Sequence, residues 1–174
     1  MSGRVEALWT KRAHRGVMDP HREVVCVAGK GIAGNTCRSS TRQVTIIARE
    51  QWEAMMRELG GAAPAALDAA ARRANILVSG IDLATSRGKV LRLGSVRVRI
   101  LGETRPCERM DEALPGLRAA MDPEWRGGAF GEMLDDGPLA VGDAAVWERS
   151  ASSRFTLNRV VAPRARSSMT GEVR

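Results

Sequence analysis

One cysteine stands out because of the residues that surround it. Cys107 follows a proline and lies between Arg105 and Arg109, in the segment formed by residues 103–110. Nearby positive charge favours the thiolate, the form that attacks sulfur and ligates soft metals. Most free cysteines are instead small buried apolar residues. The local sequence favours a reactive Cys107 only slightly over that alternative.

The remaining cysteines and the histidines form no metal-binding or disulfide pattern. Cys26, Cys37 and Cys107 include no CxxC pair, and His14 and His21 lie outside any HExxH motif. We therefore expect three free thiols in a soluble protein of the reducing cytoplasm. The N-terminus lacks the apolar centre of a signal peptide, and no apolar run reaches about 18 residues, so we expect no membrane association.

Two further segments carry residues suited to binding an anion. The glycine-rich loop at residues 29–35 lacks the GxxxxGK[ST] spacing, but its backbone amides could still hold an anion. A flexible connection with residues at positive φ explains this loop equally well. Arg72 and Arg73 could clamp a phosphate, or could end a helix with both charges in water.

The composition describes one folded domain with few aromatic residues. The chain has 174 residues, of which 44% are hydrophobic and 3% aromatic, with no tyrosine. This length suits a single domain with its own core. Stacking platforms for single-stranded nucleic acid need aromatic side chains, so we do not expect nucleic-acid binding of that kind.

The charge of +7 is concentrated toward the C-terminus, where residues 150–174 hold five arginines and one glutamate. We expect a single domain over residues 1–149 and a partly flexible basic extension over residues 150–174. The extension could bind nucleic acid or anionic lipid through phosphates, but a solvated terminus is the better interpretation.

Hydrophobic patterns predict many short strands with a few helices inserted between them. The hairpin at residues 89–101, with Gly94 and Ser95 at its turn, should bury one face and leave the other basic. Residues 11–21 are polar and contain Gly16 and Pro20, so we predict a loop there. The other expected strands cover residues 4–9, 23–28, 42–48, 76–78, 129–134, 139–147 and 155–161. The expected helices cover residues 50–59, 64–72 and 108–121, and the last is interrupted at Pro115 and Gly116, which could divide it into two short helices around a turn. Regular βαβ alternation is missing, which favours a mostly β barrel with inserted helices (α+β) over a doubly wound sheet.

Taken in order, these segments resemble the MOSC family, named for the C-terminal domain of molybdenum cofactor sulfurase. The resemblance covers about residues 25–148. Its motifs lie at residues 31–35, 42–45, 72–76, 80–83, 93–94, 105–107, 126–128, 137 and 142–143. Asn35 departs from the family pattern, which usually has aspartate there, so a carboxylate role is in doubt. Cys37 follows closely and could be a second thiol near the site.

The resemblance implies a strand-rich MOSC-type β-barrel and a function that involves sulfur and the molybdenum cofactor. Cys107 matches the signature cysteine, which is proposed either to carry sulfur as a persulfide or to ligate molybdenum. On this basis Cys107 is the expected catalytic residue and metal ligand. The residues expected to bind the anionic pterin cofactor are Arg42, Arg73, Asn75, Arg105, Arg126 and Gly128.

Three functions follow, and the sequence does not decide whether the protein is an enzyme. The first is a molybdenum-cofactor-binding protein that reduces N-hydroxylated compounds, which would need an electron-donor partner. The second is a sulfur carrier for metal–sulfur cofactor assembly, supplied by a cysteine desulfurase whose pyridoxal phosphate would reside in that partner. The third, ranked last, is a non-enzymatic basic binding protein that uses the C-terminal arginines.

Overall fold

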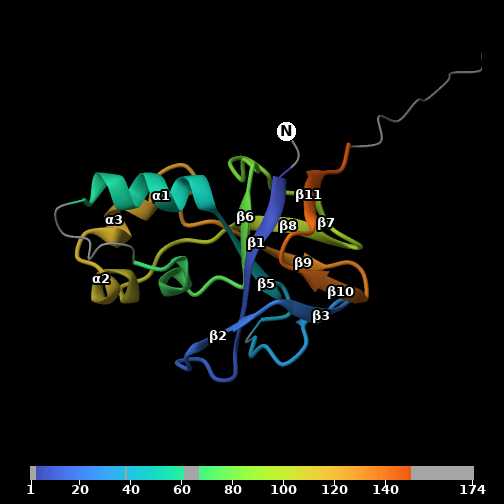
Figure 1. Cartoon of the computed structure of the whole chain (residues 1–174). Helices are drawn as coiled ribbons and strands as arrows, with labels where there is room; N and C mark the ends of the chain where they lie inside the picture. Colours follow the sequence, from blue (N-terminus) through green and yellow to red (C-terminus); the bar gives the residue numbers. More distant parts are fainter. Residues whose placement is uncertain (1–2, 38, 61–66, 150–174) are drawn as a thin grey trace, which may run out of the picture.

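A closed barrel of seven strands forms the centre of the protein, as described by a computed structural model for residues 3–37, 39–60 and 67–149 (Figure 1). Its strands follow the order β11–β7–β8–β9–β5–β6–β1, and β1 pairs again with β11 to close the ring. The barrel strands are β1 (Gly3–Lys11), β5 (Val44–Ala48), β6 (Ile76–Ser79), β7 (Val90–Leu93), β8 (Val96–Glu103), β9 (Ala129–Met133) and β11 (Ala144–Trp147). The predicted strand-rich barrel with few helices is confirmed.

Further strands and short helices surround the barrel. Strand β2 (Met18–His21) pairs with β1, while β10 (Gly137–Ala140), β3 (Glu23–Val27) and β4 (Gly31–Ile32) form a separate small sheet. The helices are α1 (Arg49–Glu58), α2 (Arg109–Ala113), α3 (Leu117–Met121) and the 3-10 helix η1 (Ala69–Arg72). Figure 1 shows α1, α2 and α3 gathered on one side of the barrel. Within the described ranges, no helix is long and apolar enough to cross a membrane.

The helices cover a second core, which lies against the outer wall of the barrel. Strand β5 shows the division, because Ile46 belongs to the core inside the barrel and Ile47 to the core beneath the helices. Met55 of α1 and Leu117 of α3 are fully buried in that second core. A segment that is buried on both faces carries consecutive apolar residues, as Ile46, Ile47 and Ala48 of β5 do.

The hairpin of β7 and β8 delivers the chain to Cys107. Its turn has Gly94 at a φ of +56°, and Val98 pairs with Leu91 across it. The outward arginines of β8 are neutralised, since Arg97 pairs with Asp135 and Arg99 pairs with Glu132. The predicted buried face is confirmed, and the basic face contributes little free positive charge.

Other expected elements differ from those observed. The expected loop at residues 11–21 contains β2, which tolerates Pro20 because it lies at an edge of the sheet. The expected strand at residues 139–147 divides into β10 and β11, since the turn at Gly142, with a φ of +98°, passes the chain to another sheet. Of the expected helix at residues 64–72, the structure describes only η1. The expected strand at residues 155–161 and the basic extension lie outside the described residues.

Gly128 has a structural role that the sequence did not indicate. Its φ is +94°, and a Cβ atom there would lie 2.2 Å from the backbone oxygen of Ile46 on β5. A side chain at this position is therefore both strained and in collision with rigid backbone. The close approach lets the end of the turn pack against β5. It is a sufficient reason for a glycine at this position, and no bound cofactor is needed to explain it.

We predict that Gly128→Ala lowers the free energy of unfolding by about 3 kcal/mol or more. The matched control is Gly34→Ala, because Gly34 also has positive φ (+76°) but a Cβ atom there would meet no described atom within 4 Å. The control should cost about 1 kcal/mol, from backbone strain alone. Urea unfolding of both variants measures the difference, and equal losses would show that the contact with β5 is unimportant.

Candidate functional site

Cys107 lies in the segment that leaves β8 and enters α2. Its side chain is exposed and it lines a cavity of about 630 Å³. Its backbone oxygen accepts a hydrogen bond from the amide of Met110 (2.9 Å), which begins the turn of α2. Because Met110 is buried in the core beneath the helices, packing fixes the backbone that carries the thiol.

Six cationic side chains line this cavity with Cys107. They come from β1, from the approach to β5, from the end of η1 and from α2 and α3, and they are Lys11, Arg42, Arg72, Arg73, Arg109 and Arg118. Of the described residues in the lining, Glu108 alone carries a carboxylate. Across the part of the chain that the structure describes, none of the six cations forms an ion pair with a carboxylate. The cavity is therefore strongly attractive to anions.

Arg72 is the most deeply placed of these cations, with 7% of the residue exposed. Its Nε donates to the backbone oxygen of Gly127 (2.8 Å), and its Nη2 donates to that of Thr104 (3.2 Å). Burial lowers the pKa of Arg72 to about 10, so the group stays charged at neutral pH. A buried charge with no opposite charge is costly, and a bound anion would remove that cost.

Thr104 adds a second unsatisfied group to the same cavity wall. The residue is 4% exposed, and its Oγ1 atom is buried without a hydrogen-bond partner among the described residues. Native proteins rarely leave a buried hydroxyl unpaired unless a ligand or water completes it. The unbalanced charge of Arg72 is therefore the feature of this wall that favours an anionic group in the cavity.

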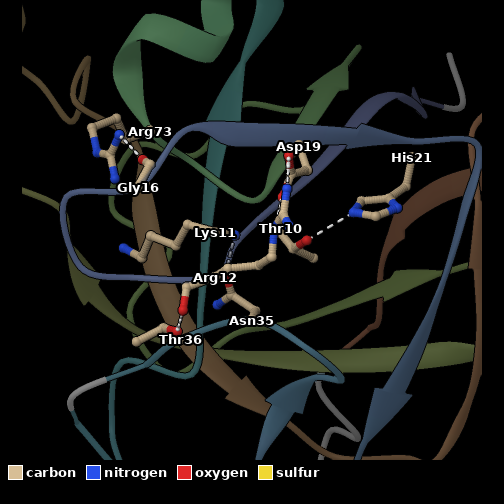
Figure 2. Close-up of polar contacts among 9 residues, drawn as sticks. All are labelled: Thr10, Lys11, Arg12, Gly16, Asp19, His21, Asn35, Thr36 and Arg73. Carbon is tan, nitrogen blue, oxygen red and sulfur yellow. Dashed lines mark hydrogen bonds and ion pairs between the residues drawn. The ribbon is translucent and has the colours of Figure 1, made fainter.

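Arg73 connects the cavity to the turn between β1 and β2. Its Nη1 donates to the backbone oxygen of Gly16 (2.8 Å), and its Nη2 donates to that of His14 (3.1 Å), as Figure 2 shows in part. Burial, followed by the charge of Arg109, lowers the pKa of Arg73. Arg73 also has a φ of +63° and ends η1. Although Arg72 and Arg73 lie at the end of η1, their side chains line the cavity and are not simply solvated charges at the end of a helix.

A second cavity of about 480 Å³ adjoins the first. The two share Lys11, His14, Arg42 and Thr45, so they form one groove with two branches. The other described residues of the second branch are neutral and include Cys37. The thiol expected near the site therefore faces the adjoining branch of the groove.

Two asparagines organise the wall of this second branch. Asn75 Oδ1 accepts from the amide of Thr45 (3.1 Å), and Asn75 Nδ2 donates to Asn35 Oδ1 (3.1 Å). Asn35 Oδ1 also accepts from the amide of Lys11 (3.0 Å; Figure 2). One neutral oxygen thus accepts from two donors, which explains how asparagine serves at the position where Asn35 departs from the family pattern.

The structure separates the residues that the sequence proposed for the site. Arg42, Arg73 and Cys107 line the first branch, and Asn75 lines the second. Arg105 and Arg126 are not among the lining residues of either branch. Arg105 is exposed with Asp122 at 3.8 Å, and Arg126 makes two short contacts to Glu58 (2.7 and 2.9 Å) that lower the pKa of that carboxyl. Arg126 therefore binds the turn before β9 to α1.

Four of the lining cations were not among the residues expected to bind the cofactor: Lys11, Arg72, Arg109 and Arg118. Arg72 and Arg109 had a signal in the sequence, since each lies close to a proposed residue. Lys11 and Arg118 had none, because only the folded chain brings the end of β1 and helix α3 to Cys107.

The fold and the groove define a barrel protein that presents a thiol beside an anion-binding cavity. The MOSC domain model matches residues 21–146, so this chain belongs to the MOSC domain family. No curated protein sequence matches the chain.

Solved structures share the fold at low sequence identity. The YuaD protein of Bacillus subtilis is 19% identical with a TM-score of 0.68, and the alignment covers 83% of this chain and 94% of that one. YiiM of Escherichia coli is 16% identical with a TM-score of 0.67, covering 87% and 72% of the two chains. YiiM of Geobacillus stearothermophilus is 14% identical with a TM-score of 0.66, covering 87% and 77%. These likenesses concern the fold alone.

We predict that pyrophosphate stabilises the protein and that Arg109→Gln weakens the effect. A ligand at about ten times its Kd adds about 1.4 kcal/mol, which raises the Tm of a domain of this size by about 3–5 °C. Losing one charge-assisted contact should raise Kd about tenfold. Arg99→Gln is the control, because Arg99 pairs with Glu132 away from the groove. Thermal unfolding with and without pyrophosphate measures the rise in Tm for each variant. An equal rise in Tm for both variants would contradict the anion site.

Proposed function

We propose that this MOSC protein binds the molybdenum cofactor in the first branch of the groove, with Cys107 as the protein ligand to the metal. The observation that carries the proposal is the buried guanidinium of Arg72, which lies beside Cys107 in the cavity and lacks a carboxylate partner among the described residues. A phosphate-bearing pterin supplies the missing negative charge.

The available side chains fit this group. The described residues contain no cluster of three His, Cys, Asp or Glu side chains that could hold a metal ion. A metal at Cys107 must therefore arrive with most of its ligands on a cofactor, and a soft thiolate suits molybdenum. Arg72, Arg73 and Arg109 would hold the phosphate.

The activity that we propose is reduction of N-hydroxylated compounds. When bound, the cofactor supplies a redox-active metal. Reduction of an N–OH group takes up two electrons and two protons, breaks the N–O bond and releases water. The electrons must come from an electron-donor protein. In this scheme the chain's own residues bind the anion and orient the thiol.

We predict that protein made in a cofactor-producing host contains molybdenum and that Cys107→Ser loses it. Cys37→Ser is the matched control, because Cys37 is also an exposed thiol but lines the other branch. Both thiols are exposed, and a serine hydroxyl can keep the hydrogen bonds that Cys37 Sγ donates to the backbone oxygens of Ser39 and Arg42. Neither change should therefore alter the free energy of unfolding by more than about 0.5 kcal/mol. Metal analysis by mass spectrometry decides the matter. Wild-type protein that neither contains molybdenum nor binds added cofactor would refute the proposal.

A sulfur carrier is the second candidate function, and the exposure of Cys107 favours it. The Cys107 thiolate would attack the outer sulfur of a desulfurase persulfide. The S–S bond of the donor breaks, the donor cysteine leaves as a thiolate, and a persulfide forms on Cys107.

Incubation with a cysteine desulfurase and cysteine should then add one sulfur atom to the protein. We predict that intact-mass measurement finds this adduct on wild type and on Cys37→Ser but not on Cys107→Ser. An adduct that persists in Cys107→Ser, or no adduct on wild type, counts against sulfur transfer by Cys107.

A further inference from the structure

We propose that a third hollow, beside the Cys107 cavity, docks an acidic segment of a partner protein and buries one aliphatic side chain of that segment. This docking groove lies between the tip of the β1–β2 hairpin, η1 and α2, and its volume is about 430 Å³. Both candidate functions need a second protein to bring electrons or sulfur to Cys107. The inference goes beyond the proposed function and rests on it only for what the partner delivers.

The docking groove is mainly apolar, and an exposed valine stands at its edge. Six of its nine described lining residues are apolar: Val17, Met18, Ala70, Ala71, Met110 and Ala113. Val17 is 79% exposed, more than Val25 and Val146, the other exposed large hydrophobic residues of the described ranges. An exposed apolar side chain that continues into an apolar hollow is typical of a surface that a partner covers.

The hairpin tip is braced, so Val17 is presented on a fixed surface. Arg73 Nη1 donates to the backbone oxygen of Gly16 (2.8 Å), directly before Val17, as Figure 2 shows. Across the hairpin, Arg12 Nε forms an ion pair with Asp19 (2.9 Å). A surface that is already ordered loses less conformational entropy when a partner binds.

Positive charge at the docking groove favours an acidic partner. Arg73 and Arg109 line it, against Glu112 as the one carboxylate of the described lining. Arg15 is exposed on the hairpin tip, two residues before Val17. In the part of the chain that the structure describes, none of these three arginines forms an ion pair with a carboxylate. Carboxylates on a partner would complement this charge and speed its association.

The docking groove leads to the reactive thiol, because Arg73, Arg109 and Met110 line both it and the Cys107 cavity. A segment seated there lies beside Cys107. An anionic lipid surface also attracts an exposed valine near arginines. A membrane surface is broad, however, whereas a hollow between three elements suits a projecting protein segment that places one side chain in it.

The test uses three pentapeptides with blocked ends, titrated calorimetrically into the whole protein. The first has the sequence Asp-Glu-Leu-Glu-Asp, the second replaces its leucine with serine, and the third replaces its four acidic residues with lysine. We expect the leucine peptide to bind about tenfold more tightly than the serine peptide, because only leucine gains from burial in the docking groove. The basic peptide should not bind, because the arginines repel it.

Val17→Ser should raise the Kd of the leucine peptide about fivefold, because part of the apolar contact is lost, and should leave that of the serine peptide within about twofold. Val25→Ser is the matched control, because Val25 is 57% exposed on β3 and is not among the described residues that line the docking groove. At about five times its Kd, the leucine peptide should also slow iodoacetamide alkylation of Cys107 about threefold or more, and that of Cys37 less than about 1.5-fold.

Equal affinities of the leucine and serine peptides, equal affinities of the leucine peptide for both valine variants, or no binding would each overturn the inference. Val17-dependent sedimentation with phosphatidylglycerol vesicles, without peptide selectivity, would assign the tip to a lipid surface and would overturn it too. The outcome is separable from that of the proposed function. Bound molybdenum without peptide selectivity refutes only the docking groove, whereas peptide selectivity without molybdenum refutes only the cofactor.

Discussion

The placement of one buried cation governs the whole site. Arg72 bonds to the backbone oxygens of Gly127 and Thr104, so a single guanidinium joins the end of η1, the segment after β8 and the turn before β9. Two of these segments, the end of η1 and the segment after β8, line the cavity with Cys107, and the turn before β9 supports them from behind through Gly127. Gly127 permits the arrangement, because a Cβ atom there would lie 2.3 Å from the backbone oxygen of Thr104 and 3.6 Å from Arg72 Nη2. Backbone carbonyls satisfy the hydrogen bonds of the guanidinium but leave its charge unbalanced. The hydrogen bonds of Arg72 that hold the cavity wall together therefore also leave an unbalanced positive charge there, which favours binding of an anion.

The barrel makes this arrangement possible by dividing its apolar residues between two cores. Strand β5 is buried on both faces, so α1 and α3 pack against its outer side while the barrel interior stays filled. Met110 of α2 is held in the same outer core, one helical turn beyond Cys107. The thiol is thus exposed on a segment whose backbone is anchored. Rigid support with an accessible reactive atom is the usual requirement of a binding or catalytic site.

Local sequence predicted the strands well, because alternation and β-branched runs report burial directly. The hairpin around Gly94 and the double-faced β5 are examples. The site was harder to predict, since its cations come from elements that are distant in the sequence. An arginine that lines a cavity also looks the same in sequence as one that forms a surface ion pair. Arg73 directly follows the helix expected at residues 64–72, and Arg126 precedes two glycines. Glu58 neutralises Arg126, whereas Arg73 lines the cavity. Gly128 lies in a segment that matches a family motif. Its close packing against Ile46 is by itself a sufficient reason for a glycine at this position. The family resemblance singled out Cys107 as the candidate thiol. Only the tertiary contacts show which arginines form ion pairs with carboxylates and which do not.

The departure at Asn35 is where the sequence and the groove are most closely linked. An aspartate there would place a negative charge beside Lys11, at the boundary shared by the two branches. That charge would partly neutralise the cations that draw an anion into the first branch. Asparagine keeps the acceptor that Lys11 and Asn75 need and removes the charge. Among the described lining residues, those beyond the boundary in the first branch therefore include four further cations, whereas those beyond it in the second branch are neutral. This division requires no moving part, because it follows from which side chains on a fixed barrel are ionised and which are amides.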